Sequence, residues 1–167
     1  MKNIVLMGFM GAGKTTVGKE LAKAMNCEFI DTDEQIEKEQ GCKISEIFSR
    51  EGEEAFRNLE TELLKRLQNR KEMFVLSIGG GMPVRAENRE LLRNLGEVVY
   101  LRTSKEEIIR RLSGDTNRPL LQGGALEEKV TFLMNAREQI YIETAHREVL
   151  TDGKEPLEIV KNIKELS

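Results

Sequence analysis

Residues 8–15 read Gly-Phe-Met-Gly-Ala-Gly-Lys-Thr, and this stretch restricts the fold and the ligands of the chain more than any other. The spacing G-x-x-x-x-G-K-T is typical of a phosphate-binding P-loop, in which glycines let backbone N–H groups turn toward a phosphate chain. In this pattern Lys14 reaches the outer phosphates, and the hydroxyl of Thr15 can ligate Mg²⁺. The residues expected to contact the phosphates of a nucleotide are Gly11, Ala12, Gly13, Lys14, Thr15 and Thr16.

The residues on either side of this loop support the same interpretation. Residues 4–7 form a short apolar run, and Val17, Leu21 and Met25 recur at the four-residue spacing of a helix face. A strand, a glycine loop and a helix therefore follow one another in the order that a P-loop requires. The N-terminus of such a helix adds about half a positive charge where phosphates would lie. A chance glycine-rich turn is the alternative.

Length and composition favour one domain over residues 1–167. With 39% hydrophobic residues the chain can bury a core of its own. The net charge of -3 argues against a nucleic-acid partner. No apolar stretch has the length of a membrane span, and the N-terminus does not read as a signal peptide. We expect a cytoplasmic monomer that binds neither nucleic acid nor membrane.

The cysteines and the histidine restrict the chemistry further. Cys27 and Cys42 are the only cysteines and lie far from any metal-ligand pattern, so we expect reduced, partly buried thiols. His146 is the only histidine. A histidine-based triad or a multi-histidine metal site is therefore almost excluded.

Two aspartates follow the second predicted strand, residues 28–31. The sequence there is Asp31-Thr32-Asp33, and residues i and i+2 of a strand point to the same side. If the extended conformation persists, both carboxylates face one site at the C-terminal end of the strand. The alternative is that Asp33 is the N-cap of the following helix, and both roles can coexist.

A mostly helical segment is predicted next, at residues 34–71, with breaks near Gly41 and Gly52. Arg57 and Glu60 lie three residues apart on its longer part, close enough for Glu60 to hold the guanidinium. Such pairs are usually surface decoration, so the pair alone favours a structural role.

Three consecutive glycines, Gly79, Gly80 and Gly81, follow an apolar strand at residues 73–78. Glycines permit positive φ values and let a ligand touch the backbone itself, at an entropic cost that makes them poor purely structural residues. A tight strand-to-helix turn is the alternative.

The remaining elements continue the alternation of strands and helices. They are a helix around residues 91–95, a strand at residues 98–101, a helix with a capping box of Ser104 and Glu107, a strand around residues 149–151 and a helix opened by Pro156. Five short strands separated by helices predict an α/β fold with a doubly wound parallel sheet, whose ligands bind at the C-terminal strand ends.

Residues 113–125 interrupt this alternation. They have glycines at both ends and Arg118-Pro119 in the middle, which is typical of a hinged lid. We therefore predict a mobile lid over about residues 113–125.

The ordered set of motifs resembles shikimate kinase, a small member of the nucleoside-monophosphate-kinase-like group of P-loop proteins, over essentially the whole chain. The motifs are GFMGAGKTT at 8–16, DTD at 31–33, FRNLE at 56–60, GGG at 79–81, RPLL at 118–121 and the pair Arg137-x-x-x-Tyr141. A P-loop alone is common to many families, but this ordered set is specific.

The resemblance implies transfer of the γ-phosphate of ATP to the 3-hydroxyl of shikimate, on the pathway toward chorismate and aromatic amino acids. The helical segment at about residues 32–71 would help to bind the substrate. Asp33 would orient the substrate hydroxyls, and the substrate would be held by Arg57, Arg137 and the glycines Gly79, Gly80 and Gly81. Two arginines suit a carboxylate, and an aspartate suits hydroxyls.

On the nucleotide side, the resemblance implies that Arg118 closes over the phosphates of ATP and that Arg110 and Pro156 flank the adenine. Lys14, Asp33 and Arg118 would then be the catalytic residues. We expect Thr15 to ligate Mg²⁺ directly and Asp31 to do so through water. Ordinary surface roles for Arg110 and Pro156 are the alternative.

A P-loop is also compatible with three other functions. A regulatory GTPase would have N-K-x-D and D-x-x-G motifs, and neither occurs. A non-catalytic nucleotide-binding scaffold should have lost a reactive residue, yet Lys14, Asp33 and Arg118 are all present. A gluconate-type or nucleoside-monophosphate kinase stays open as the second choice.

Overall fold

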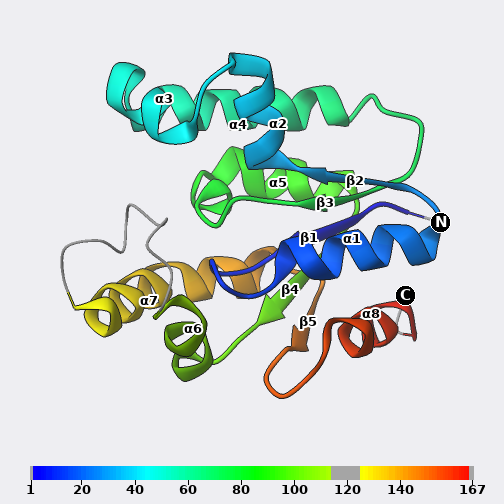
Figure 1. Cartoon of the computed structure of the whole chain (residues 1–167). Helices are drawn as coiled ribbons and strands as arrows, with labels where there is room; N and C mark the ends of the chain where they lie inside the picture. Colours follow the sequence, from blue (N-terminus) through cyan, green and yellow to red (C-terminus); the bar gives the residue numbers. More distant parts are fainter. Residues whose placement is uncertain (1, 114–124, 166–167) are drawn as a thin grey trace.

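A five-stranded parallel sheet forms the centre of the computed structural model, which describes residues 2–113 and 125–165 (Figure 1). In spatial order the strands are β2 (Glu28–Asp31), β3 (Phe74–Ser77), β1 (Ile4–Met7), β4 (Glu97–Arg102) and β5 (Arg147–Leu150). Every neighbouring pair is parallel. The predicted five-stranded parallel sheet is therefore confirmed.

Helices follow the strands along the chain and cover both faces of the sheet. They are α1 (Lys14–Met25), α2 (Thr32–Gln40), α3 (Ile44–Glu51), α4 (Glu53–Leu67), the 3-10 helix η1 (Met82–Val84), α5 (Ala86–Leu95), α6 (Lys105–Leu112), α7 (Leu126–Thr144) and α8 (Pro156–Glu165). Helices α1 and α8 pack on one face, and α4 and α5 pack on the other. Helices on both faces make the sheet doubly wound, as predicted.

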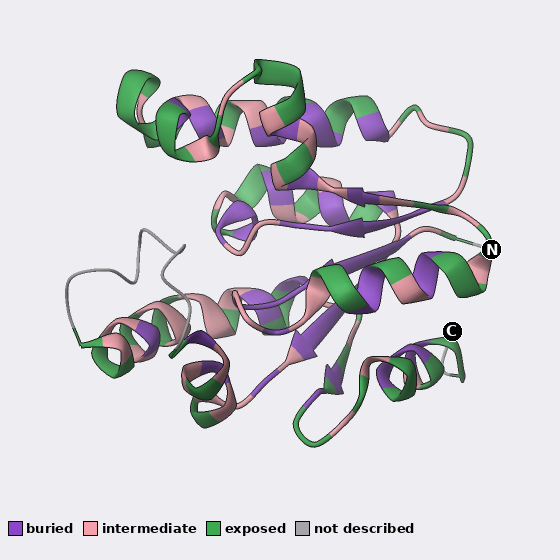
Figure 2. Cartoon of the chain, in the orientation of Figure 1, coloured by how far each residue is buried: buried purple, intermediate pink, exposed green. Residues whose placement is uncertain are grey.

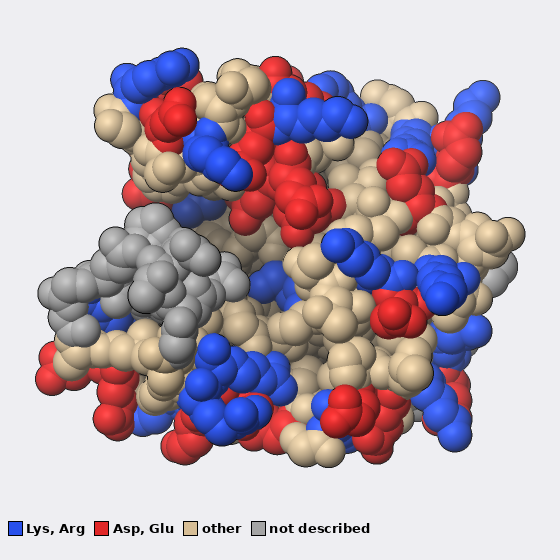
Figure 3. Space-filling model, in the orientation of Figure 1, with Lys and Arg blue, Asp and Glu red and all other residues tan. Residues whose placement is uncertain are grey.

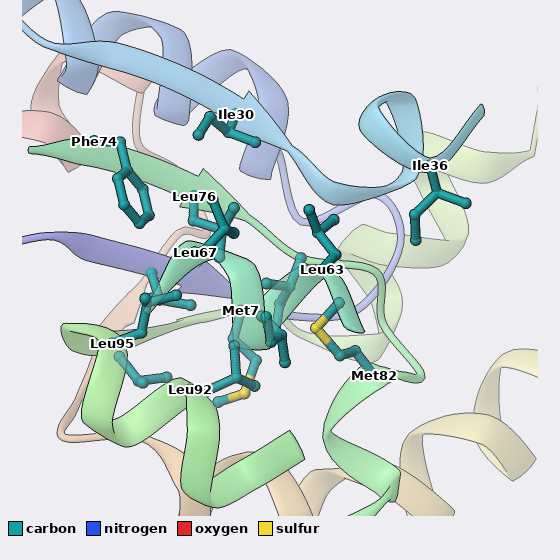
Figure 4. Close-up of a cluster of buried hydrophobic side chains, with 14 of the residues drawn as sticks. Met7, Ile30, Ile36, Leu63, Leu67, Phe74, Leu76, Met82, Leu92 and Leu95 are labelled. Atoms are coloured by element: carbon teal, nitrogen blue, oxygen red, sulfur yellow. The ribbon is translucent and has the colours of Figure 1, made fainter. Parts of the chain in front are cut away.

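The central strand β1 shows how the sequence builds two buried layers. Successive side chains of a strand point to opposite faces. Val5 and Met7 accordingly join the cluster with α4 and α5, and Ile4 and Leu6 join the cluster with α1 and α8. Figure 2 shows this strand buried, with exposed residues on the outer sides of the helices. Figure 4 shows how side chains of the first cluster meet from strands and helices.

A third apolar cluster lies beside the P-loop. It joins Phe9 of the loop to Ile108 and Leu112 of α6 and to Val130 of α7. The two helices on either side of residues 114–124 therefore pack against the loop that is expected to hold phosphates.

The predicted breaks in the helical segment at residues 34–71 are confirmed. Gly41 ends α2 with φ of +70°, and Gly52 precedes α4 with φ of +91°. Glycine adopts positive φ at little cost, whereas other residues are strained there. The segment is therefore three helices, α2, α3 and α4.

The last strand was predicted too late in the chain. It spans Arg147–Leu150 and not residues 149–151. Because β5 is at the edge of the sheet, only Val149 of this strand is buried. Arg147 and Glu148 are polar, so the sequence of the strand contains no apolar run that would reveal where it begins.

The capping box predicted for α6 forms only in part. Ser104 Oγ accepts a hydrogen bond from the backbone N–H of Glu107 at 3.2 Å. The carboxylate of Glu107 binds Arg110 and Arg111, because bonds to a charged guanidinium are stronger than bonds to a neutral N–H. The backbone N–H of Ser104 donates instead to Asp152 Oδ1 at 2.9 Å.

Both cysteines are placed as expected from the sequence. Cys27 and Cys42 are free and half-buried. His146 accepts a hydrogen bond from the backbone N–H of Val98 at its Nδ1, 2.9 Å away. Within residues 2–113 and 125–165, no three or more His, Cys, Asp or Glu side chains form a metal-binding group. None of the helices in this part is long and apolar enough to span a membrane.

Candidate active site

The P-loop connects β1 to α1 and has the curled backbone that its glycines permit. Gly11 and Gly13 have φ of +85° and +88°, a region that favours glycine. Lys14 is the first residue of α1, and its Nζ donates to the carbonyl oxygens of Gly8 at 2.6 Å and Phe9 at 3.2 Å. The ammonium group therefore lies across the mouth of the loop.

Asp31 brings the end of β2 to the beginning of α1. The hydroxyl of Thr15 donates a hydrogen bond to Asp31 Oδ2 at 3.4 Å. Two oxygen atoms that could ligate a metal ion therefore lie side by side. Asp31 is also the N-cap of α2, because its Oδ1 accepts a hydrogen bond from the backbone N–H of Glu34 at 3.1 Å. The alternative that Asp33 is the N-cap is therefore wrong.

Asp33 lies in the first turn of α2 and not in an extension of β2. The strand ends at Asp31, so the expected alternation of i and i+2 along a strand does not apply. The charge of Asp31 nevertheless acts on the carboxyl of Asp33. Burial, with the charge of Asp31 as the next cause, raises the pKa of Asp33 to about 6. A carboxyl with a pKa near neutrality can exchange a proton under physiological conditions.

The triple glycine is the point at which three predicted site residues meet. A β-carbon at Gly79 would lie 2.9 Å from Asp33 Oδ1, and one at Gly80 would lie 3.2 Å from Arg137 Nη1. A β-carbon at Gly81 would overlap the guanidinium of Arg57. Each glycine therefore provides room for one functional side chain.

The reason for these glycines is close approach and not unusual backbone torsion. Among the described glycines with positive φ, none is at positions 79–81. The sequence argument that they supply positive φ is thus wrong. The argument that the backbone must be approached closely is supported, although here the approaching groups are the side chains of the chain itself.

Arg57 and Glu60 form a buried ion pair on α4. Arg57 Nη1 and Glu60 Oε1 are 2.6 Å apart, and the side chain of Glu60 is 0% exposed. The surface role favoured by the sequence alone is therefore wrong. Burial raises the pKa of Glu60 to about 7 despite the opposing effect of Arg57. Glu60 Oε2 is buried and has no hydrogen-bond partner among the described residues.

Tyr141 extends this site from α7. Its hydroxyl donates to the carbonyl oxygen of Gly80 at 2.6 Å, and its ring packs on Tyr100 with the ring centroids 5.3 Å apart. Burial raises the pKa of Tyr141 to about 12, so the phenol stays protonated as a donor. Arg137, four residues earlier on the same helix, contacts the same glycine.

The charges around the site differ between its two sides. Figure 3 shows a hollow in this face of the molecule, with acidic side chains above it over α2 and basic side chains below it over α6. The first turn of α2 carries Asp33 and Glu34, and the last turn of α6 carries Arg110 and Arg111. The acidic side at α2 can therefore accept hydrogen bonds from hydroxyl groups, and the basic side at α6 can bind phosphates.

Arg111 is a residue that the sequence analysis missed. Its Nη1 donates to the carbonyl oxygen of Gly11 in the P-loop at 2.8 Å. Arg110, the residue predicted beside the adenine, has a side chain that is 72% exposed and binds Glu107. A helical wheel could have separated them, because Arg111 is on the side of the buried Ile108 and Arg110 is not.

The other predicted nucleotide residues are only partly placed. Pro156 is the first residue of α8, half-buried, and the turn before it is tied to α6 through Asp152 and Ser104. Arg118 and most of the lid predicted at residues 113–125 lie outside the described residues.

Comparisons with known proteins agree with the geometry. The model of the family described as "Shikimate kinase" matches residues 10–167. A shikimate kinase from Thermodesulfovibrio yellowstonii is 45% identical over 98% of this chain and 93% of its own length. The solved shikimate kinase from Acinetobacter baumannii in complex with shikimate is 43% identical, with a TM-score of 0.93, over 99% of this chain and 92% of that one. The structure from Aquifex aeolicus is 35% identical, with a TM-score of 0.84, over 98% of this chain and 94% of that one.

Proposed function

The chain belongs to the shikimate kinase family, and from this premise we propose that its P-loop and its triple-glycine loop form the nucleotide and acceptor halves of one active site. The enzyme phosphorylates shikimate with ATP as the co-substrate, in the biosynthesis of aromatic compounds. The observation that carries the proposal is the meeting of Asp33, Arg57 and Arg137 on three consecutive glycines.

We assign the acceptor half to residues whose chemistry matches shikimate, a small carboxylate with hydroxyl groups. Arg57 and Arg137 offer two guanidiniums, which bind a carboxylate through paired, charge-assisted hydrogen bonds. Asp33 offers a carboxylate to the hydroxyls. Gly79, Gly80 and Gly81 leave room for these three side chains, so their charged groups can gather around the substrate at one loop.

The nucleotide half is assigned to the P-loop, α6 and the beginning of α8. Backbone N–H groups from Gly11 to Thr16 would surround the phosphates of ATP, and Lys14 would leave its loop carbonyls to bind them. The contact of Arg111 with Gly11 makes it, beside Arg110, a candidate for the adenine or the phosphates. Pro156 would lie on the side of the adenine opposite the arginine.

Thr15 and Asp31 fit Mg²⁺, because they bring two oxygen donors together at the end of β2. Mg²⁺ usually keeps several waters and takes only one or two protein ligands beside the phosphates. When bound, the ion neutralises charge on the β- and γ-phosphates. Thr15 would be a direct ligand, and Asp31 would hold a coordinated water.

The residues support an in-line transfer. The 3-hydroxyl oxygen of shikimate attacks the γ-phosphorus as the bond to the bridging oxygen breaks, ADP leaves, and the hydroxyl proton passes to Asp33. Phosphoryl transfer needs mainly position and cations over developing charge. Asp33 and the two acceptor arginines supply position, while Lys14 and Arg118 supply positive charge.

The experiment that tests this proposal is an assay of ADP release with shikimate, gluconate and AMP as acceptors. We expect Mg²⁺-dependent turnover with shikimate and far less with the other two acceptors. Equal turnover with AMP would contradict the assignment of the acceptor half. Activity that persists after chelation of divalent ions would show that the reaction does not depend on Mg²⁺. Family membership argues against the second choice of a gluconate-type or nucleoside-monophosphate kinase.

We also propose that the enzyme is a monomer and acts in the cytoplasm. Every residue assigned to the site comes from one chain, so the site needs no second copy. Sedimentation at micromolar concentration and fractionation of cells test the two statements.

A further inference from the structure

Three buried hydroxyl groups connect the loop at residues 79–82, which is the triple glycine and the Met82 that follows it, to the helices around it. They belong to Thr32 on α2, Thr61 on α4 and Tyr141 on α7, which are 0%, 4% and 1% exposed. We propose that these three are positioning residues: each fixes its helix to the loop and thereby aims one substrate-binding side chain. This inference rests on the proposed function, since it concerns the acceptor half of that site.

The first connection holds α2. The backbone N–H of Gly79 donates to Thr32 Oγ1 at 3.2 Å. Thr32 directly precedes Asp33, whose carboxylate lies over the same glycine. One hydrogen bond therefore sets the distance between the loop and the carboxylate that is proposed to orient the attacking hydroxyl.

The second connection holds α7. Tyr141 donates its hydroxyl proton to the carbonyl oxygen of Gly80, and Arg137 lies one helical turn earlier on the same face. A β-carbon at Gly80 would lie 3.2 Å from both the Tyr141 oxygen and Arg137 Nη1. The phenol of Tyr141 and the guanidinium of Arg137 are therefore both positioned relative to Gly80.

The third connection holds α4 and passes through Asn88, which is 0% exposed. Thr61 Oγ1 lies 2.7 Å from Asn88 Oδ1 and 3.0 Å from the carbonyl oxygen of Arg57. A hydroxyl has one proton, and in an α-helix the Arg57 oxygen already accepts from a backbone N–H, so we assign the proton to Asn88. Asn88 Nδ2 then donates to the carbonyl oxygen of Met82 at 3.1 Å, and Arg85 donates to Thr61 at 3.1 Å.

The loop depends on these bonds because three glycines have no side chains to pack. A loop of that kind is held by its backbone hydrogen bonds alone. Removing a buried hydroxyl leaves its partner unsatisfied and permits the loop and helix to move apart. A displacement of about 1 Å is enough to weaken the hydrogen bonds of the substrate-binding side chains, since such bonds require donor–acceptor distances of about 2.7–3.2 Å.

The test compares variants that lose one hydroxyl and little else. Thr61→Val and Tyr141→Phe remove the proposed connections, and Thr61→Ser keeps the hydroxyl. Thr144→Val is the matched control, because Thr144 is 1% exposed and its hydroxyl donates to the carbonyl oxygen of Ile140 within α7. We expect the KM for shikimate to rise roughly 5- to 30-fold in the first two variants, as the loss of a buried hydrogen bond predicts. The KM for ATP should stay within about twofold, and Thr61→Ser should restore most of the affinity.

A double-mutant cycle tests whether Thr61 acts through Arg57. If it does, adding Thr61→Val to Arg57→Ala should change the KM for shikimate by less than about twofold. Full additivity of the two changes would overturn the proposal. So would a KM for shikimate in Thr61→Val and Tyr141→Phe that equals that of the control. Thermal melts identify variants that fail to fold, and if Thr61→Val is one of them, Tyr141→Phe, which loses a single oxygen, still decides.

The cycle also separates this inference from the proposed function. An unchanged KM in Arg57→Ala alone would contradict the role of Arg57 in the acceptor half. A raised KM in Arg57→Ala together with a normal KM in Thr61→Val would leave the proposed function standing and overturn the positioning roles.

Discussion

The guanidinium of Arg57 lies directly against the α-carbon of Gly81, at a place where any β-carbon would overlap it. Arg57 cannot retreat easily, because Glu60 holds it from the buried side at 2.6 Å. The residue at position 81 therefore limits the positions that the Arg57 guanidinium can adopt. In turn, Arg57 limits which residues fit at position 81.

We accordingly expect Gly81→Ala to raise the KM for shikimate by about tenfold or more, since overpacking of this size costs on the order of 1–3 kcal/mol. Steady-state kinetics with shikimate varied at saturating ATP measure the effect. The KM for ATP serves as the internal control. Normal kinetics for shikimate would mean that Arg57 moves freely and does not bind the substrate.

Arg137→Ala should also act mainly on the KM for shikimate. A charge-assisted contact that exists before and during transfer is worth about 1.5–3 kcal/mol, so we expect a rise of roughly 10- to 100-fold with a smaller change in kcat. Gln139→Ala, on an exposed position of the same helix, is the control. An unchanged KM in Arg137→Ala would remove this residue from the site.

Asp33→Asn should lower kcat by roughly 10²- to 10⁴-fold, because the amide keeps the shape of the carboxylate but cannot accept the hydroxyl proton. Affinity for ATP should barely change. The measurement is single-turnover transfer with a thermal melt beside it. A normal rate with a lowered melting temperature would indicate a purely structural role.

Arg118→Ala should lower kcat by on the order of 10³-fold, as expected for an arginine that meets transition-state charge in phosphoryl transfer, and should leave folding intact. Lysine should rescue activity only in part, because an ammonium offers a point charge in place of a fork onto two oxygens. A kcat within about threefold of wild type in Arg118→Ala, a change under roughly 1 kcal/mol, would make it a surface residue.

The raised pKa of Glu60, about 7, predicts a pH dependence of stability. An unfolded glutamate titrates near 4.3, so between these values the folded chain holds a proton that the unfolded chain has lost. The contribution of Glu60 to the free energy of unfolding should therefore fall as the pH rises from about 4.3 to about 7. Glu60→Gln should flatten this part of the curve, measured by urea unfolding at each pH.

Glu62→Gln is the matched control for that measurement, because its side chain is 67% exposed on the same helix. We expect its curve to follow that of wild type. Equal slopes for wild type and Glu60→Gln between these pH values would show that Glu60 stays ionised beside Arg57.

The sequence predicted those parts of the molecule that follow from local periodicity. The P-loop, the apolar strands and the breaks at Gly41 and Gly52 depend on neighbours in the chain, and they were found. β5 was misplaced because an edge strand needs few apolar residues. The burial of Glu60 could not be read from a spacing of three, since it results from packing between helices far apart in sequence.

The same limit explains the errors within the site. Asp31 and Asp33 are both acceptable N-caps, and only the point at which β2 ends decides between them. Arg110 and Arg111 are a different case, because they are chemically identical but the apolar face of α6 separates them, with Arg111 on the side of the buried Ile108. The bonds of Thr32 and Tyr141 to the glycines, and the bond of Thr61 to Asn88, join segments separated by 27 to 61 residues and leave no local signal.

The order of the elements along the chain has a consequence for how this enzyme can change its acceptor. From Thr32 to Asn88 one uninterrupted segment carries α2, α3, α4, β3 and the triple glycine, and Arg137 is the only proposed acceptor residue outside it. The nucleotide residues precede or follow this segment. The choice of acceptor therefore depends almost entirely on one continuous segment of the chain. Recombination or design could replace this segment with another while the residues that bind the nucleotide stay unchanged.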